Sequence, residues 1–266
     1  MKMGGFGRIA DYDAIKAAGF DYAELDLPEI EELSDDAFEA FCEKVNREGF
    51  PVLTGARALP IADPWFFTDL FSLDAWRPYM AKACERASRL GIRKIIIGNG
   101  KARWLLDDTS IQKERNFLDL LRLFSAYCRE YGMEMILEPL GPDYSNYINT
   151  LPEAVRVIKA AGNDNLFIMA DLRHLYRGGE PYEDIVTCAD YLHHVHVDYP
   201  EVFPARPYPS PDDGFDYSPF LDAVRHAGYD DTLTVEADVP SDWKTAHDRA
   251  ARVLEAILCR FSALVL

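Results

Sequence analysis

The chain has 266 residues, of which 48% are hydrophobic, and this length suits one α/β barrel of about 250 residues. Its formal net charge is −17, from 28 Lys and Arg against 45 Asp and Glu, and such a surface repels the phosphate backbone of nucleic acids. No apolar segment reaches the roughly 18 residues of a membrane span, and residues 1–10 lack the apolar stretch of a secretory signal. We therefore expect a cytoplasmic protein without nucleic-acid or membrane partners.

Short apolar or β-branched runs alternate with longer amphipathic segments along the chain, which predicts strands that alternate with helices. In chain order, each predicted strand and the helix after it occupy residues 2–5 and 11–18, 22–27 and 34–48, 52–55 and 76–90, 94–98 and 110–131, 134–140 and 151–161, 166–171 and a short segment after Pro181, 193–197 and 217–227, and 232–236 and 243–261. Gly follows several of these helices, as at Gly19 and Gly91, where it permits the left-handed conformation that ends a helix.

Eight strand–helix units predict an all-parallel sheet that closes into a single (β/α)8 TIM barrel of the α/β class. The rival, an open doubly wound sheet, loses its main support because no G-x-G-x-x-G motif follows the first strand. No linker or low-complexity tract divides the sequence, so we expect residues 1–266 to form one domain. Two long segments, residues 58–75 and 199–216, follow strands and should lie over the face of the barrel that carries active sites.

The five cysteines all fall in predicted helices; they are Cys42, Cys84, Cys128, Cys188 and Cys259. None forms a C-x-x-C pair, and their number is odd, so neither a disulfide framework nor a cysteine zinc site is expected. Buried, reduced thiols that pack as small apolar side chains are the favoured interpretation.

Acidic and imidazole groups stand at the ends of four successive predicted strands. Glu138, Asp171 and Glu236 end the fifth, sixth and eighth strands, and His196 lies near the end of the seventh. In a barrel these ends meet at one mouth, where three like charges repel unless a divalent cation neutralises them. Three oxygen donors and one nitrogen suit a fairly hard ion, foremost Mn²⁺, with Mg²⁺, Co²⁺ and Zn²⁺ as further candidates.

Each of these groups also has a structural interpretation. Asp171 is equally well placed to cap the helix that follows it. His194 and His196 share one face of their strand, so only one of them need bind a metal while the other lines the pocket. The functional interpretation depends on all four groups occurring on successive strands, which chance explains poorly.

These motifs, in this order, resemble the xylose isomerase-like TIM barrel superfamily, which includes ketose 3-epimerases, hydroxypyruvate isomerase and inosose dehydratase. The matching segments, which cover most of the chain from Lys94 onward, are E-P-L at 138–140, N-T at 149–150, D-x-x-H at 171–174, H-V-H at 194–196, G-Y at 228–229 and V-E-A at 235–237. The resemblance implies a divalent metal ion held by Glu138, Asp171, His196 and Glu236.

The resemblance also implies how a substrate is held. His174 matches a residue that contacts substrate oxygens, and Arg206 matches a substrate-binding Arg in the loop after the seventh strand, although it could also be a solvated surface residue. Lys101 and Arg103 lie in GNGKAR, which is similar to a G-S-G-x-A-R turn of some members. They could hold an anionic or polar group of the substrate, or equally be solvated cations. Trp65, with the adjacent Phe, could form an apolar wall against a sugar face.

One loop departs from the family pattern. Many epimerases of this type read E-P-L-N-R-[FY]-E, whereas this chain reads E-P-L-G-P-D-Y, with Tyr144 at the position of the family's second Glu and Asp143 just before it. The usual substrate contact is therefore missing or replaced, which weakens the ketohexose epimerase interpretation more than it weakens the fold or the metal site.

The resemblance implies a metal-dependent isomerase or epimerase of a sugar or sugar phosphate. Glu138 or Glu236 would remove a proton next to a carbonyl, and the other Glu would return a proton to the resulting metal-bound cis-enediolate. The altered loop keeps open a lyase of the inosose dehydratase or carbon-glycoside-cleaving type, in which a group on the β-carbon leaves instead. The oligomeric state is left open between a monomer and a homo-oligomer, although dimers and tetramers are common among such relatives.

Two other classes fit the sequence less well. An endonuclease of the same barrel type would need a three-zinc cluster and a basic surface, whereas this chain has six His and a charge of −17. A non-catalytic sugar-binding barrel would have no use for two Glu residues on the metal ion.

Overall fold

Within residues 1–258, which the computed structural model describes, eight parallel strands close into a barrel. In chain order the strands are β1 (Lys2–Gly7), β2 (Tyr22–Asp26), β3 (Val52–Ala56), β4 (Lys94–Ile97), β5 (Glu134–Leu137), β6 (Leu166–Asp171), β7 (Leu192–Val197) and β8 (Thr232–Val235). Each strand pairs with the next in sequence, and β8 pairs with β1, so the sheet closes on itself. The predicted (β/α)8 barrel is therefore confirmed.

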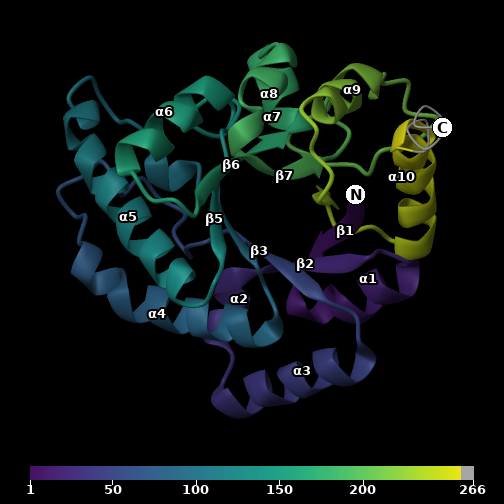
Figure 1. Ribbon diagram of the computed structural model, residues 1–266, viewed down its shortest axis with the longest axis horizontal. Helices are drawn as coiled ribbons and strands as arrows, with labels where there is room; N and C mark the ends of the chain where they lie inside the picture. The colour runs from purple at the N-terminus through teal and green to yellow at the C-terminus, as the bar shows by residue number, and fades with distance from the viewer. Residues whose placement is uncertain (259–266) are drawn as a thin grey trace.

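Helices form a ring around the barrel (Figure 1). They are α1 (Tyr12–Ala18), α2 (Leu27–Glu32), α3 (Asp35–Glu48), α4 (Leu73–Leu90), α5 (Glu114–Glu130), α6 (Leu151–Ala161), α7 (Leu172–Gly178), α8 (Glu183–Thr187), α9 (Ser218–His226) and α10 (Trp243–Leu258). Short 3-10 turns add η1 (Ile9–Asp11), η2 (Lys101–Arg103), η3 (Ser110–Lys113) and η4 (Ala189–Tyr191). In this described part of the chain, no helix combines the length and the hydropathy needed to cross a bilayer. The last residues of the helix predicted at 243–261 lie outside the described residues.

Two of these helices, α2 and α7, do not follow from the sequence pattern. They contain six and seven residues and begin with no connecting loop after β2 and β6, so their 3.6-residue periodicity does not separate from the strand pattern before it. Each begins directly after a strand that ends in Asp, and that Asp caps the helix. The carboxylate of Asp26 accepts from the N–H of Glu29 at 3.1 Å, and that of Asp171 accepts from the N–H of Arg173 at 2.7 Å.

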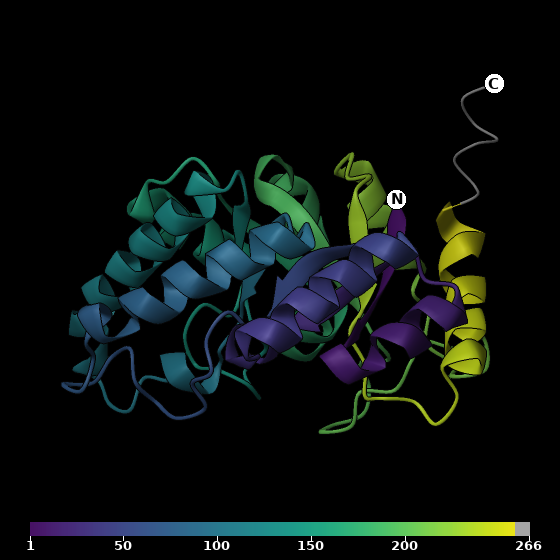
Figure 2. The same cartoon turned by 90° about the horizontal axis from the view of Figure 1, so that it is seen from below.

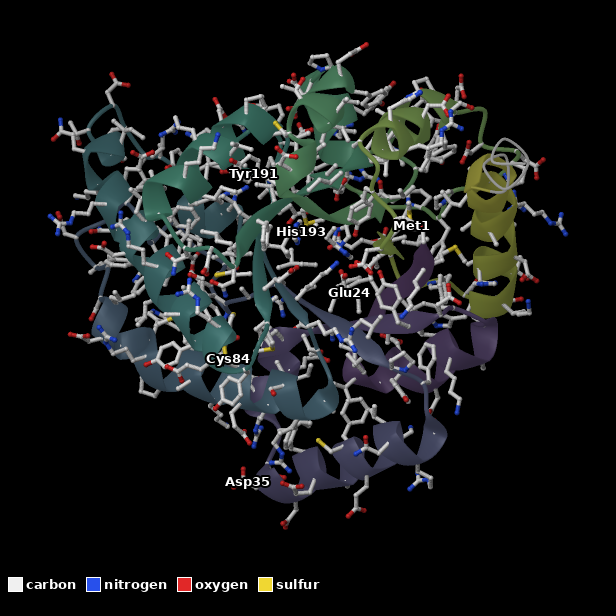
Figure 3. The ribbon with its side chains drawn as sticks, viewed as in Figure 1. Met1, Glu24, Asp35, Cys84, Tyr191 and His193 are labelled. Carbon is white, nitrogen blue, oxygen red and sulfur yellow. The ribbon has the colours of Figure 1, made fainter. Side chains whose placement is uncertain are left out.

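The inside of the barrel is apolar on one side and polar on the other. Ile96, Ile136 and Met169 pack together from β4, β5 and β6. The opposite side carries buried polar side chains, which are Tyr22, Glu24, Thr54, His194 and Thr234. A glycine makes room for this side, because a Cβ at Gly4 would lie 2.2 Å from the Tyr22 ring. Figure 3 shows Glu24 within the ring of strands.

The long loops gather at one end of the barrel, the lower edge of Figure 2, where the strands end. Residues 58–75 begin just after β3, and residues 199–216 begin just after β7. The four described cysteines are buried and form no disulfide; they are Cys42, Cys84, Cys128 and Cys188. The expectation of buried, reduced thiols holds for these four, whereas Cys259 lies outside the described residues.

Candidate metal centre

Glu138, Asp171, His196 and Glu236 converge at the C-terminal mouth of the barrel. One ligand atom from each side chain lies within 4.8 Å of the others, and Asp171 pairs with His196 in the register of β6 and β7. Glu138 and Glu236 stand one residue beyond β5 and β8, where their N–H groups still donate to the last carbonyl of the neighbouring strand, at 3.1 and 3.2 Å. The barrel backbone therefore holds all four side chains in place.

The buried Nδ1 atom of His196 faces the three carboxylates. It has no hydrogen-bond partner among the described residues, and it lies 3.2 Å from Glu236 Oε2, 3.7 Å from Asp171 Oδ2 and 3.9 Å from Glu138 Oε1. Three carboxylates and one imidazole nitrogen around a common space form an oxygen-rich donor set, and a divalent cation there would offset the repulsion between like charges. The residues present fit a divalent metal ion.

Asp171 serves two structural tasks with its two oxygens. Oδ1 accepts from the N–H groups of Arg173 at 2.7 Å and His174 at 3.3 Å, which caps α7. Oδ2 faces the other way, 3.7 Å from His196 Nδ1. The capping interpretation and the ligand interpretation of Asp171 are therefore compatible, because each uses a different oxygen. The cap also fixes the start of α7, and His174 Nε2 consequently lies 3.5 Å from Glu138 Oε1.

Arginines form a second layer around the carboxylates. Nη2 of Arg206 lies 2.7 Å from Glu236 Oε2 and 3.2 Å from Asp171 Oδ2, and its Nε donates to Asp198 at 2.8 Å. Asp198 also accepts from the fully buried Arg173 at 2.6 Å. Asp198 thus holds both guanidinium groups, and it directs that of Arg206 toward the centre.

Burial and neighbouring charges act in opposite directions on these groups. Burial would raise the pKa of Asp171, but His174, His196 and Arg206 hold it well below its usual value. Burial would likewise raise the pKa of Glu236, but Arg206 and His196 lower it. Both carboxyl groups are therefore ionised at neutral pH, which is the state in which a carboxylate can bind a metal ion.

A cavity of about 620 Å³ opens beside these carboxylates, a size typical of small-molecule sites. Glu138 and Glu236 line it together with three predicted substrate contacts, His174, Arg206 and Lys101. Its apolar wall is formed by Ile61, Ala62, Trp104, Leu140, Tyr144, Phe203 and Pro204.

The expected wall at Trp65 lies elsewhere. Its ring packs against those of Phe66, Phe71 and Trp76, with centroids 5.1 to 6.1 Å apart, and neither Trp65 nor Phe66 lines the cavity. The loop buries these rings against each other because rings with this much apolar surface gain more from mutual packing than from exposure. Trp104, 39 residues further along the chain, is the tryptophan that lines the cavity.

Arg103 and His194 also lie outside the cavity lining. Arg103 is fully buried, and its Nη2 donates to the backbone carbonyl of Glu138 at 2.6 Å, so it supports the loop after β5 from behind. His194 is buried inside the barrel, where its nitrogens contact Thr232 at 2.9 Å and Glu24 at 3.0 Å. Neither side chain is placed to reach a substrate in the cavity.

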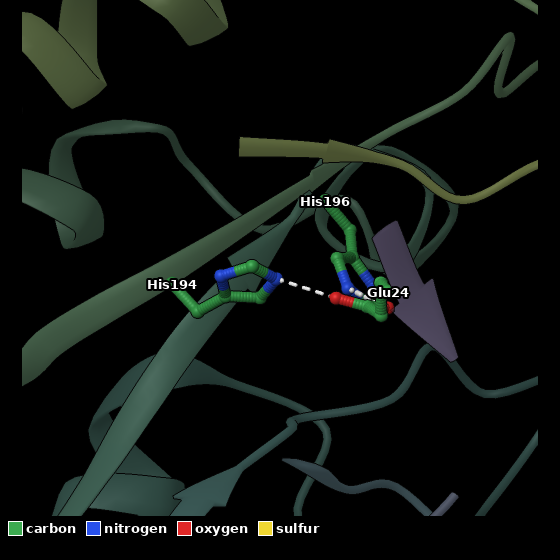
Figure 4. A group of neighbouring side chains, drawn as sticks. All are labelled: Glu24, His194 and His196. Atoms are coloured by element: carbon green, nitrogen blue, oxygen red, sulfur yellow. Dashed lines mark hydrogen bonds and ion pairs between the residues drawn. The ribbon is translucent and has the colours of Figure 1, made fainter. Parts of the chain in front are cut away.

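Three buried residues of this region were not predicted from the sequence; they are Glu24, Asp198 and Arg173. Glu24 lies 2.9 Å from His196 Nε2 (Figure 4). One sequence signal could have found Glu24: a Glu in the middle of the run YAELD, where an interior charge requires a partner. Asp198 follows β7, and its partner Arg173 follows β6. The sequence alone does not show that these two side chains meet.

Residues 12–257 match a family model described as xylose isomerase-like TIM barrel. A curated relative, an inosose isomerase from Bacillus velezensis, is 24% identical over 192 residues, which are 66% of this chain and 66% of the relative, slightly less than two thirds of its length. Among solved structures, an L-ribulose 3-epimerase superposes with a TM-score of 0.81 at 16% identity, covering 100% of this chain and 98% of its own. An IolI protein with a bound zinc atom superposes with a TM-score of 0.77 at 18% identity, covering 98% and 99%. At these identities the solved structures establish the shared fold.

Proposed function

The chain belongs to the xylose isomerase-like TIM barrel family, and on this premise we propose that it is a divalent-metal-dependent isomerase or epimerase of a sugar or sugar phosphate. The observation that carries the proposal is the convergence of Glu138, Asp171, His196 and Glu236 beside a cavity of small-molecule size. The names of two similar proteins, an inosose isomerase and an L-ribulose 3-epimerase, support a carbohydrate substrate.

The same four side chains would hold the metal ion. When bound, a divalent ion at this position polarises a carbonyl oxygen as a Lewis acid. We propose Mn²⁺ as the native ion because three of the four donors are carboxylates, and Zn²⁺ is the alternative that the zinc-bound IolI structure supports.

Glu138 and Glu236 are the proposed acid–base pair. They follow β5 and β8, which are separated by two strands in the barrel, so they approach the cavity from different sides. One Glu removes the proton next to the substrate carbonyl, and the other returns a proton. Return to the opposite face of the same carbon gives an epimer, and return to the neighbouring carbon gives an isomer. A positioned acid–base pair of this kind contributes about 10²–10⁴-fold to a rate.

Three cavity residues are proposed to hold the substrate. Arg206 and His174 lie against the carboxylates and carry N–H groups suited to the substrate oxygens near the reacting carbon. Lys101 lines the cavity and forms no ion pair with any other described residue, so it is free to bind a phosphate or another anionic substituent.

A proton-exchange experiment tests the proposal. The Mn²⁺-loaded enzyme is incubated in D₂O with a panel of ketoses, keto-polyols and their phosphates, the ion is then removed with a chelator, and the sugars are examined by NMR. We expect one class of sugar to lose a C–H signal next to its carbonyl while the carbon skeleton stays intact. No exchange in any sugar, from a preparation that binds Mn²⁺, would reject the isomerase proposal.

Two variants connect that exchange to the site. Glu138→Gln and Glu236→Gln are each expected to lower the exchange rate by about 10²–10⁴-fold, because each removes one member of the acid–base pair. Glu134→Gln is the matched control, since Glu134 begins the same strand β5 at the opposite end of the barrel. The roles are wrong if all three variants exchange protons at the same rate.

A lyase is the second candidate, and Tyr144 is the observation that favours it. Tyr144 lines the cavity, and its buried hydroxyl has no hydrogen-bond partner among the described residues. Burial raises the pKa of Tyr144, so the hydroxyl keeps its proton and could pass it to a leaving group. An enone absorbance from a keto-polyol, without deuterium in the recovered substrate, would identify this reaction.

A further inference from the structure

Glu24, on β2, lies beneath the four converging side chains. It is fully buried, and its Oε1 atom is 2.9 Å from Nε2 of His196 while its Oε2 atom is 3.0 Å from Nε2 of His194 (Figure 4). We propose that Glu24 is a positioning residue for the metal centre, because it holds the His196 imidazole in the one tautomer and orientation that leaves Nδ1 free for a divalent ion. This inference rests on the metal site of the proposed function.

The two oxygens of Glu24 have different surroundings. Oε2 accepts from the hydroxyls of Thr54 at 2.7 Å and Thr234 at 2.9 Å in addition to its contact with His194. Oε1 has no hydrogen-bond donor of this kind among the described residues and lies 2.9 Å from Nε2 of the His196 ring. Three donors therefore anchor the carboxylate through one oxygen, and the other oxygen is fixed at the position that the His196 ring approaches.

The chemistry of the two groups determines where the proton lies. An ionised carboxylate only accepts hydrogen bonds, so the Nε2 atom that faces Glu24 must carry the proton. In a neutral imidazole the remaining lone pair is then on Nδ1, the atom that faces Glu138, Asp171 and Glu236. A carboxylate behind a metal-binding histidine fixes its ring and increases its basicity as a ligand, which gives this buried charge a use that packing alone does not.

A second metal ion between Glu24, His194 and His196 is the competing interpretation, because these side chains also lie close together. Oε2 of Glu24 already accepts from the hydroxyls of Thr54 at 2.7 Å and Thr234 at 2.9 Å, so an ion bound there would have to displace these donors. The other nitrogen of His194 is held by Thr232 at 2.9 Å. We therefore interpret the group as a buried support for one ion site, in which Glu24 is hydrogen-bonded to His194 and in ion-pair contact with His196.

The test measures metal binding directly. Purified wild-type protein, Glu24→Gln and Glu24→Ala are titrated with MnCl₂, and free Mn²⁺ is read by electron paramagnetic resonance. We expect Glu24→Gln, which keeps the shape of the side chain, to bind Mn²⁺ about 10–100-fold more weakly than the wild type, as is usual when such a supporting group is changed. If Glu24→Ala fails to fold by circular dichroism, Glu24→Gln still answers the question.

Tyr22→Phe is the matched control. Tyr22 is as deeply buried on the same strand and bonds to Thr234 at 2.7 Å, so its loss disturbs the same interior without touching His196. Its Mn²⁺ affinity should stay within about threefold of the wild type. NMR of ¹⁵N-histidine-labelled, Zn²⁺-loaded protein supplies a second readout, with the His196 proton expected on Nε2 in the wild type.

The outcomes separate the two proposals. Wild-type Mn²⁺ affinity in Glu24→Gln, or a His196 proton on Nδ1, overturns the role of Glu24. A wild-type protein that binds no divalent ion overturns the metal site, and with it both proposals. A protein whose Mn²⁺ affinity depends on Glu24 but which exchanges no sugar proton supports the positioning role and rejects only the isomerase.

Discussion

At Gly98, the residue after β4, a Cβ atom would lie 2.2 Å from Glu138 Oε2. The glycine therefore leaves the space that the proposed catalytic carboxylate occupies. Because the obstructing atom is the end of a flexible side chain, Gly98→Ala should fold while it displaces that carboxylate. We expect the proton-exchange rate to fall by about 10²-fold, the usual consequence of a misplacement of about 1 Å.

Gly178→Ala is the control for this prediction, because the nearest atom to a Cβ there is 3.8 Å away, an ordinary contact. Both variants are compared by NMR exchange and by thermal unfolding. Equal exchange rates for Gly98→Ala and the wild type would show that the space beside Glu138 is not needed for activity.

Tyr144→Phe distinguishes the two candidate reactions. Its hydroxyl would make one neutral hydrogen bond to an isomerase substrate, worth about 0.5–1.5 kcal/mol, so KM should rise by about 2–10-fold with kcat nearly unchanged. In a lyase the hydroxyl would donate the proton itself, and kcat would instead fall by about 10²-fold or more. Steady-state kinetics on the sugar found by the exchange screen decides between these results.

At the residue scale, the sequence locates those groups whose position follows from strand ends. Glu138, Asp171, His196 and Glu236 each lie within one residue of a strand end, and parallel strands end at one mouth, so their meeting can be inferred without coordinates. Trp65 was expected in the cavity, but the path of a long loop has no periodicity from which it could be predicted. Asp26 and Asp171 also show that one Asp at a strand end can cap a helix, and Asp171 does so while it faces the metal centre.

Glu180 connects two elements, because it follows α7 and its Oε1 accepts from the N–H of Leu151 at 2.7 Å, at the start of α6. Burial raises the pKa of Glu180 to about 7 from an ordinary value of 4.5. The folded chain therefore holds this proton more tightly than the unfolded chain does. Its contribution to stability is fully present below pH 4.5 and is lost as the pH rises through about 7.

Glu180→Gln should remove this pH dependence, because the amide keeps an acceptor for Leu151 and carries no charge. Thermal unfolding at pH 5, 6, 7 and 8 should show the variant gaining on the wild type as the pH rises, by about 2–4 °C for each kcal/mol of difference. A Tm difference that stays constant over this range would contradict the prediction.

At the element scale, the long helices and the strands were predictable, since each carries a clear periodicity and several helices end in Gly. Helices α2 and α7 were not predictable, because each has only one or two turns and begins at one capping Asp rather than showing a repeated pattern. The position of α7 matters nonetheless, because this helix places His174 at the edge of the cavity.

For the whole molecule, removal of the ion should lower stability, because three carboxylates from three strands are left close together. Binding at 100 times the Kd stabilises a fold by about 2.7 kcal/mol, and this corresponds to about 5–10 °C in Tm for a chain of this size. Thermal unfolding with EDTA and then with added MnCl₂ measures the difference. Asp171→Asn should show a much smaller response, and an equal response in this variant would place the ion elsewhere.

The order of strands and helices was enough to predict the barrel, since eight repeated units leave few other arrangements. What the sequence could not supply was which interior residues face each other. Glu24 and His196 are 172 positions apart and meet only across the closed cylinder. Such a contact depends on the stagger of all the strands between them.

The pairing of β8 with β1 also determines when the centre can first exist. Glu236 follows β8, the last of the eight barrel strands to be synthesised, and β8 is held in register by β1, the first of the eight. A nascent chain with seven strands synthesised contains Glu138, Asp171 and His196 but not Glu236. It would therefore lack one of the four proposed metal ligands. Under the proposed metal site, tight binding of an ion during biosynthesis would therefore require the closed barrel.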